Sequence, residues 1–262
     1  MPGTLHIVGL GPGGPEHRTP AASRAVAEAE VVVGYGAYVD HAEDLVDPRR
    51  QRVIRGVMGE EERRADEALV LAAEGARVAL VSSGDAGVHG MAARTLARAA
   101  ELEAGDRPTV VVVPGVSAAQ AAAAIAGALL TDDFAVVSLS DIHMSWDRIE
   151  HRLRALAASG LAIALYNPRS SRRTEGFDRA IAILREARGD DGPVVLAHDV
   201  TRSGERVERT TLGTLDPERV TMRTVVLVAG DTALEAGPWL VAVRGETSRG
   251  AASRGAAAGA RT

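Results

Sequence analysis

The chain has 262 residues, of which 46% are hydrophobic, so it can form one large or two medium domains with a sizeable core. Its formal net charge of −5 does not favour binding to nucleic acid. The sequence contains no Cys and no Lys, which excludes disulfides, thiolate nucleophiles, Cys-type zinc sites, Schiff-base chemistry and a Walker P-loop.

The first half of the chain alternates apolar runs with helical patterns. We expect strands at 4–8, 31–33, 78–81 and 110–113, and helices at 20–29, 38–47, 59–74 and 91–104. Thr19 precedes Pro20 and is expected to cap the first helix. This alternation predicts a mostly parallel sheet, with the strand at 110–113 buried.

An Ala-rich helix through Ala128 then leads into a second series of elements. We expect strands at 134–139, 161–166, 194–197, 207–212 and 224–228, and helices at 146–158 and 177–187. The segment 207–212 alternates as an edge or antiparallel strand would. We therefore divide the chain into α/β domains at 1–114 and 115–244, followed by a tail, 245–262, whose Gly, Ala, Ser and Arg content predicts disorder.

Two glycine-rich loops are candidates for ligand binding. The stretch 78–91, VALVSSGDAGVHGM, is a buried strand that ends in small residues and Asp85. Parallel sheets bind ligands beyond the carboxyl ends of their strands, although an ordinary strand–turn–helix connection would also explain this stretch. Residues 9–14 match the pattern G-x-G-x-x-G, but two prolines stiffen the loop and no acidic residue ends the second strand, so we reject a nicotinamide site.

Five ordered motifs resemble the tetrapyrrole (class III) methyltransferases, which use S-adenosyl-L-methionine. They are GLGPGGPEHRTP (9–20), SSGDAGVHGM (82–91), VVPGVSAAQAAAA (112–124), LYNP (165–168) and VLVAGDT (226–232). Three further segments are most similar to the branch that methylates C17 of precorrin-3B and contracts the macrocycle in cobalamin synthesis. They are VVSLSD (136–141), YNPRS (166–170) and SGERV (203–207).

This resemblance implies a fold, a cofactor and partners. The fold is α/β, with two αβα domains and a ligand cleft between them. The methyl donor is S-adenosyl-L-methionine, and S-adenosyl-L-homocysteine is the product. We expect a cytoplasmic homodimer with a small-molecule tetrapyrrole substrate, and no metal, nucleic-acid or membrane partner; no apolar run reaches about 18 residues.

The resemblance also implies the site residues. Those expected to bind the cofactor are Pro12, Ser83, Gly84, Asp85, Val88, Ser117, Ala118, Tyr166, Asn167, Thr201 and Gly230. Asp85 would hold part of the cofactor by a hydrogen bond or by attraction to its cations. Its alternative role is to cap the next helix.

Ring contraction needs proton transfer, for which His89 and Asp141 are the catalytic candidates. The alternative role of His89 is packing, and that of Asp141 is to form a turn. Arg169 and Arg172 are expected to bind substrate carboxylates through guanidinium forks, with a solvated charged surface as the alternative. Arg55, Arg173, Arg202 and Arg206 are further choices.

Four positions depart from the family pattern, which usually has Asp at Gly14, Pro at Ala86, Tyr at His89 and Asn near Asp199. Several alternatives therefore remain open. A sibling enzyme could methylate another carbon or a cobalt-containing precursor. An enzyme of the same fold could act on a macromolecule, and an inactive subunit could bind the cofactor without transferring its methyl group.

Overall fold

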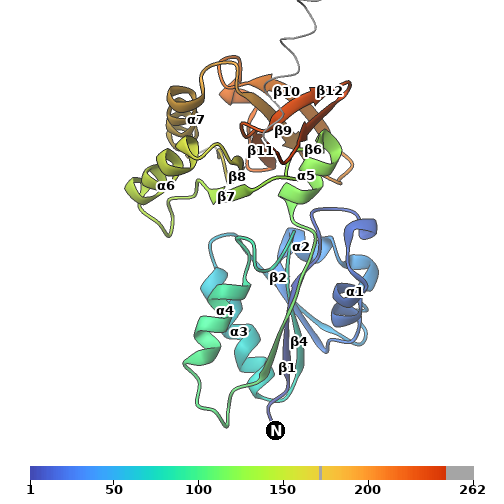
Figure 1. Cartoon of the computed structure of the whole chain (residues 1–262). Helices are drawn as coiled ribbons and strands as arrows, with labels where there is room; N and C mark the ends of the chain where they lie inside the picture. Colours follow the sequence, from blue (N-terminus) through green and yellow to red (C-terminus); the bar gives the residue numbers. More distant parts are fainter. Residues whose placement is uncertain (171–172, 246–262) are drawn as a thin grey trace, which may run out of the picture. The chain divides into compact units, whose positions relative to one another are not determined.

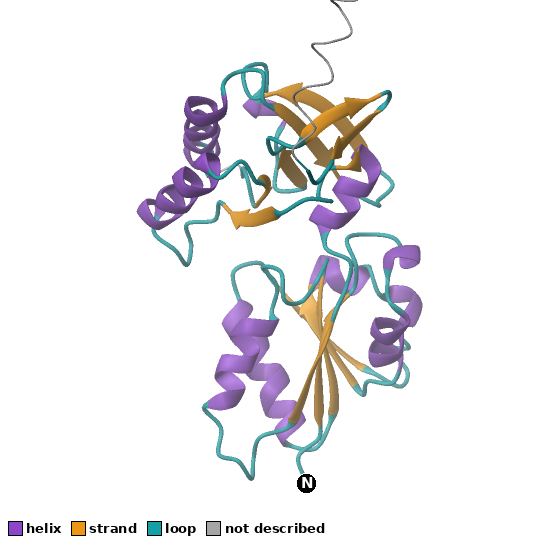
Figure 2. Cartoon of the chain, in the orientation of Figure 1, coloured by secondary structure: helices purple, strands orange, loops and turns teal. Residues whose placement is uncertain are grey.

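The computed structural model describes residues 1–170 and 173–245, and these divide into two compact units, Met1–Ala118 and the part that begins at Ala119. Both units are α/β, which confirms the predicted fold class (Figures 1 and 2). None of the described helices is long and apolar enough to cross a membrane. Arg172 and all but the first residue of the predicted tail lie outside the described residues.

The first unit is built on one parallel sheet with the strand order β3-β2-β4-β1-β5. Its strands are β1 (Thr4–Gly9), β2 (Val31–Tyr35), β3 (Arg52–Gly56), β4 (Arg77–Ser82) and β5 (Thr109–Val113). Its helices are α1 (Pro20–Ala27), α2 (Gly36–Asp40), α3 (Glu61–Ala73) and α4 (Ala92–Ala100), with 3₁₀ segments at Pro15–His17 and Glu43–Leu45. The Thr19 hydroxyl accepts a hydrogen bond from the Ala22 amide, so the predicted cap is confirmed.

Alternating side chains of the first sheet pack against helices on opposite faces. Leu5 and Ile7 of β1 belong to the apolar cluster that includes α3 and α4, whereas Val8 belongs to the cluster that includes α1. Figure 1 shows α3 and α4 together on one side of the sheet and α1 on the other. The period of two in the strands therefore produces an αβα sandwich.

Strand β5 differs from the prediction that it is buried. Val111 and Val112 are each 39% exposed, and only Val113 is buried. β5 pairs with β1 alone and therefore lies at the edge of the sheet. A continuous apolar run does not distinguish such an edge strand from a central one. β3, the opposite edge strand, was not predicted from the sequence, and the helix predicted at 38–47 extends well beyond the end of α2 at Asp40.

The second unit contains α5 (Ala118–Ala126) from its second residue on, α6 (Trp146–Ala158) and α7 (Glu175–Arg188). Its main sheet has the order β10-β9-β11-β8-β7. These strands are β7 (Phe134–Ser138), β8 (Ala162–Tyr166), β9 (Pro193–His198), β10 (Arg206–Thr211) and β11 (Thr224–Val228). β7 and β8 are parallel, β11 runs antiparallel to β8 and β9, and β10 is the antiparallel edge strand that the alternation predicted.

The core of the second unit lies between this sheet and two neighbouring helices. Ile149 and Leu153 of α6 and Phe177 and Leu184 of α7 pack with β8 residues such as Leu165. A smaller sheet, β12-β13-β6, was not predicted. Its strands are β6 (Gly127–Ala128), β12 (Ala233–Ala236) and β13 (Trp239–Ala242). α5 ends before the predicted Ala128 because Gly127, at φ +138°, turns the chain into β6.

Candidate cofactor site

Three loops of the first unit leave the sheet side by side. β4, β1 and β5 are neighbours and parallel, so the residues after each strand lie at the same edge. Gly11 donates to the Gly84 carbonyl at 3.1 Å, and Gly84 donates back to the Gly11 carbonyl at 2.7 Å. The predicted cofactor residues on this edge are Pro12, Ser83, Gly84, Asp85, Val88, Ser117 and Ala118.

The loops approach one another closely because they contain glycine at the contacts. A Cβ on Gly115 would lie 2.3 Å from the Gly84 carbonyl oxygen, and one on Gly9 would lie 2.8 Å from the Gly115 nitrogen. Gly84 has a φ of +67°, which favours glycine. A Cβ on Gly84 would meet only the Ala118 nitrogen, at 3.9 Å, so a ligand can approach the backbone of this loop.

The carboxylate of Asp85 bonds to the backbone of two of these loops. Its Oδ1 accepts a hydrogen bond from the Gly87 amide at 2.7 Å, and its Oδ2 accepts one from the Gly115 amide at 2.9 Å. The first bond forms a local turn, and the second joins the loop after β4 to the loop after β5. Asp85 does not cap α4, because the residue that precedes that helix is Met91.

Ser82 is a polar residue at this edge that is not among the predicted site residues. It is the last residue of β4 and is 3% exposed, and its hydroxyl has no hydrogen-bond partner within the described ranges 1–170 and 173–245. Pro12 and Ser117 are also buried, whereas Ser83 and Val88 are half-buried. A serine that continues an apolar strand looks like a core residue, and no sequence signal separated Ser82 from Ser83.

His89 lies at the same edge in an uncommon backbone conformation, with a φ of +54°. The pKa of its imidazole is lowered from the usual value because the surrounding chain partly desolvates the ring, although the residue stays in contact with solvent. A neutral imidazole can accept a proton near neutral pH. His89 therefore lies at the candidate site, and its role in proton transfer stays a prediction.

The second unit presents a corresponding edge, at the carboxyl ends of β7, β8 and β9. Asn167, which follows β8, donates from Nδ2 to the Ser138 hydroxyl at the end of β7 at 3.0 Å. The Tyr166 hydroxyl accepts a hydrogen bond from the Ala119 amide at 2.8 Å, in the first turn of α5. The Thr201 amide, beyond β9, donates to Glu205 at 2.7 Å. Polar side chains thus fix the backbone along this edge.

Left-handed residues mark the same strand ends. Within the described part of the chain, the non-glycine residues with positive φ are His89, Asn167, Asp199 and Thr201. His89 follows β4, Asn167 follows β8, and the other two follow β9. His, Asn and Asp adopt this conformation more readily than other residues, whereas the β-branched Thr201 is strained in it, and strain of this kind clusters at functional sites.

Gly230 does not join the other predicted residues of the second unit. It follows β11, which runs antiparallel to β8, so it lies beside the start of β8 and not beside its end. A Cβ on Gly230 would meet the Gly160 carbonyl oxygen at 2.6 Å and the Ala162 nitrogen at 2.8 Å. A glycine in this position is explained by close backbone packing. The sequence pattern gave no information on the direction of β11.

Two predicted residues of the second unit, Asp141 and Arg169, are ion-paired. Asp141 is exposed and lies 3.8 Å from the Arg173 guanidinium. Arg169 pairs with Asp178 at 3.2 Å and also with Glu218, and it lines a hollow of about 630 Å³ together with Thr174, Thr221, Met222 and other residues. Two carboxylates already offset the charge of Arg169. An anionic substrate would have to displace one of them.

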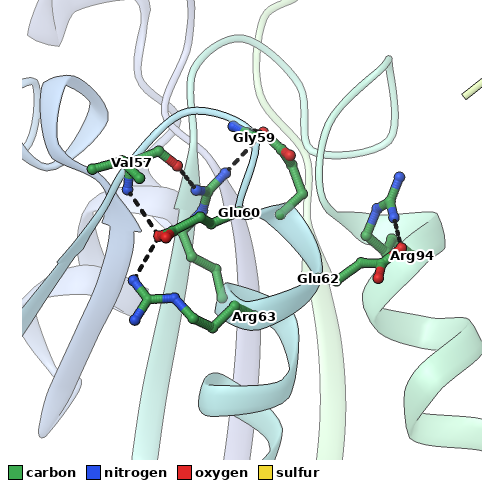
Figure 3. A network of polar contacts seen from close by, with 8 residues as sticks. Val57, Gly59, Glu60, Glu62, Arg63 and Arg94 are labelled. Atoms are coloured by element: carbon green, nitrogen blue, oxygen red, sulfur yellow. Dashed lines mark hydrogen bonds and ion pairs between the residues drawn. The ribbon is translucent and has the colours of Figure 1, made fainter. Parts of the chain in front are cut away.

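A polar network fixes the loop after β3, at the same edge of the first sheet as the glycine loops (Figure 3). Glu60 accepts hydrogen bonds from Arg63 at 2.6 Å and from the Val57 amide at 3.5 Å. Arg94 of α4 reaches Glu62 of α3 at 2.7 Å. This network holds the start of α3, and it contains none of the predicted site residues.

Comparison with known proteins identifies the class of this chain. The family model of the tetrapyrrole (corrin/porphyrin) methylases matches residues 4–216, and the chain belongs to that family. Across the described residues, no group of three or more His, Asp or Glu side chains could hold a metal ion.

The names of individual relatives are more specific than the family model. The chain is 39% identical over 230 residues to the precorrin-3B C(17)-methyltransferase of a Sinorhizobium species, covering 87% of this chain and 89% of that protein. It is 38% identical over 236 residues to the cobalt-factor III methyltransferase of Priestia megaterium, of which it spans 43% of the length. The crystal structure of the methyltransferase CobJ matches with a TM-score of 0.87 and 36% identity, covering 92% of this chain and all of that one.

Proposed function

We propose that this chain is an S-adenosyl-L-methionine-dependent C-methyltransferase of cobalamin biosynthesis, which methylates precorrin-3B at C17 and contracts the ring to give precorrin-4. The likeness to CobJ over the whole length of that structure carries the proposal. The name of the Sinorhizobium relative supports C17 as the position.

The glycine-lined edge of the first unit fits a bound S-adenosyl-L-methionine, which would supply the methyl group. Gly84 leaves its backbone approachable, and Pro12, Ser83, Val88, Ser117 and Ala118 belong to the same edge. On the second unit, Tyr166, Asn167 and Thr201 form the corresponding proposed contacts.

The proposed transfer needs alignment more than acid–base chemistry. A bond forms between C17 and the methyl carbon while the carbon–sulfur bond breaks onto sulfur, so a neutral thioether leaves. The chain has to hold the reacting atoms at about 3–3.5 Å and exclude water. Ring contraction adds a proton transfer, for which we retain His89 and Asp141; Arg169 and Arg172 are proposed to bind substrate carboxylates.

The test is incubation of the purified protein with methyl-labelled S-adenosyl-L-methionine and either precorrin-3B or cobalt-factor III under anaerobic conditions. Mass spectrometry of a singly methylated, contracted product from precorrin-3B supports the proposal. Turnover of the cobalt compound alone would assign the chain to the cobalt-containing substrate, as the name of the Priestia relative suggests. Cofactor binding without transfer to either compound would overturn the enzymatic proposal and favour an inactive cofactor-binding subunit.

We further propose that the protein works in the cytoplasm as a homodimer, on the basis of its family resemblance. Analytical ultracentrifugation at micromolar concentration should give twice the mass of the chain. A monomeric mass at all concentrations would contradict the dimer.

A further inference from the structure

We propose that Asp85 is a positioning residue of the cofactor site: its carboxylate holds the loop after β5 against the loop after β4 and does not balance the positive charge of the donor. This inference rests on the proposed function, since it concerns how the same site binds its methyl donor. It also assigns Asp85 a role that differs from the one expected from sequence.

The geometry shows where the carboxylate is used. One oxygen accepts the Gly87 amide at 2.7 Å and the other accepts the Gly115 amide at 2.9 Å. The Asp85–Gly115 bond joins positions 30 residues apart in the chain. Hydrogen bonds between a carboxylate and backbone amides are about twice as strong as neutral ones, so this pair fixes both loops.

The position of Gly115 explains why this bond matters for binding. A Cβ on Gly115 would lie 2.3 Å from the Gly84 oxygen and 2.7 Å from the Gly9 oxygen, so its backbone is packed against both other loops. Gly115 lies two residues before Ser117 and three before Ala118, which are both proposed cofactor contacts. Release of the Gly115 amide would move these contacts relative to Gly84.

The loops that follow β1, β4 and β5 contain two carboxylates, those of Asp85 and Glu16, and Glu16 lies 3.3 Å from the imidazole of the neighbouring His17. With both oxygens of Asp85 bonded to amides, the loops present backbone groups and hydroxyls to a ligand. The inference therefore predicts that loss of the carboxylate weakens the binding of charged and uncharged ligands by the same factor.

The decisive experiment measures the affinity of the wild type and of the D85N variant of the full chain for three probes. S-adenosyl-L-methionine carries a sulfonium and an ammonium, S-adenosyl-L-homocysteine carries the ammonium alone, and 5′-methylthioadenosine carries neither. Asparagine has one acceptor oxygen, so its amide nitrogen would face one of the two backbone amides. We expect the affinity for all three probes to fall by about tenfold, which corresponds to the loss of one charge-assisted hydrogen bond.

The matched control is D47N. Asp47 is exposed and also accepts the amide two residues on, from Arg49 at 3.0 Å, but it joins no second loop. D47N should bind all three probes as the wild type does. Wild-type protein that bound none of the probes would overturn the proposed cofactor, which is a different outcome from failure of the inference.

Other results with D85N would overturn the positioning role. A loss confined to S-adenosyl-L-methionine would show contact with the sulfonium, and a loss that spares only 5′-methylthioadenosine would show contact with the ammonium. Unchanged affinity for all three would show that the bond to Gly115 does not position the site.

Hydrogen exchange of the segment 113–118 provides a second readout. Exchange there should be faster in D85N than in the wild type and unchanged in D47N. If D85N does not fold, the wild type alone decides: a Gly115 amide that exchanges as fast as an unstructured peptide excludes the positioning bond, and a protected one supports it.

Discussion

The hydroxyl of Tyr166 accepts a hydrogen bond from the Ala119 amide at 2.8 Å, so the last residue of β8 satisfies a free donor at the start of α5. Replacement of Tyr166 by Phe should therefore lower the free energy of unfolding by about 1 kcal/mol. Urea denaturation of Y166F measures this change. Y35F is the control, since the Tyr35 ring packs edge-on against Tyr38 at 5.2 Å between centroids.

The same variant tests the expected cofactor contact of Tyr166. If Y166F unfolds as the wild type does but binds S-adenosyl-L-methionine much more weakly, the hydroxyl contacts the ligand and the bond to Ala119 is dispensable.

Gly115→Ala should disrupt the junction of the three loops. The added Cβ would lie 2.3 Å from a backbone oxygen that belongs to a paired loop and cannot easily move. We expect a loss of stability of about 1–3 kcal/mol and a loss of cofactor binding. Gly105→Ala is the matched control, because a Cβ there would meet nothing within 4 Å. Equal stabilities of the two variants in urea would contradict the close approach of the loops.

Protonation of His198 should destabilise the second unit at acidic pH. His198 is 6% exposed, its Nδ1 lies 2.9 Å from the Thr224 hydroxyl, and Glu208 faces its Nε2 at 3.6 Å. Burial, assisted by Arg206, lowers the pKa of the imidazole from its usual value, an effect that Glu208 and Asp199 oppose and Arg219 supports. The folded state therefore binds its proton less readily than the unfolded state does.

The sign of the pH dependence follows from linkage. The stabilising contribution of neutral His198 is complete above the unfolded pKa of about 6.5 and is lost as the pH falls toward the lower folded pKa. Urea unfolding between pH 7 and pH 5 should show this decline. H198N, which can keep a bond to Thr224 and does not titrate, should show a shallower decline, and an identical slope would exclude His198 as its source.

Arg188 should contribute more to stability than a typical surface arginine. Its guanidinium donates to the carbonyls of Leu156 at 2.9 Å, Leu161 at 2.8 Å and Ala229 at 2.8 Å, and its Nε reaches Ala157 at 3.2 Å. Desolvation lowers the pKa of this half-buried group. Lysine cannot reproduce the fork, so R188K should cost about 2 kcal/mol.

R185K is the matched control for R188K. Arg185 forms an exposed pair with Asp190 at 2.8 Å, which is expected to contribute less than about 1 kcal/mol. Chemical denaturation of both variants provides the comparison, and a loss in R185K as large as that in R188K would contradict the argument.

Periodicity predicted most helices and buried strands of this chain because their signals are local. The predicted bounds of α6 and β11 match the structure, and the Thr19 cap follows from its own residue and the next. The burial of β5 could not be predicted, since an edge strand and a central strand both read as runs of valine. The direction of β11, and with it the position of Gly230, depends on tertiary pairing.

The sequence predicted at which strand ends the candidate residues lie, but it did not predict the hydrogen-bond partners of their side chains. Strand ends marked by Gly84, Asp85 and Asn167 lie at the carboxyl edges of their sheets, where parallel topology puts them. The bond of Asp85 to Gly115 and that of Tyr166 to Ala119 join residues far apart in sequence. Composition and spacing describe which groups are available, whereas the partner of each group depends on the folded backbone.

The Asp85–Gly115 bond also bears on the order in which the protein is assembled. β5 is the last strand of the first unit along the chain and pairs only with β1, the first one. A nascent polypeptide can therefore form β1 to β4 and the contact of Gly11 with Gly84 before β5 is synthesised, but the third loop is still missing. The proposed ligand binding by this unit should thus begin only after the residues through Ala118 have left the ribosomal exit tunnel. The loop that contains Asp85 leaves the tunnel earlier.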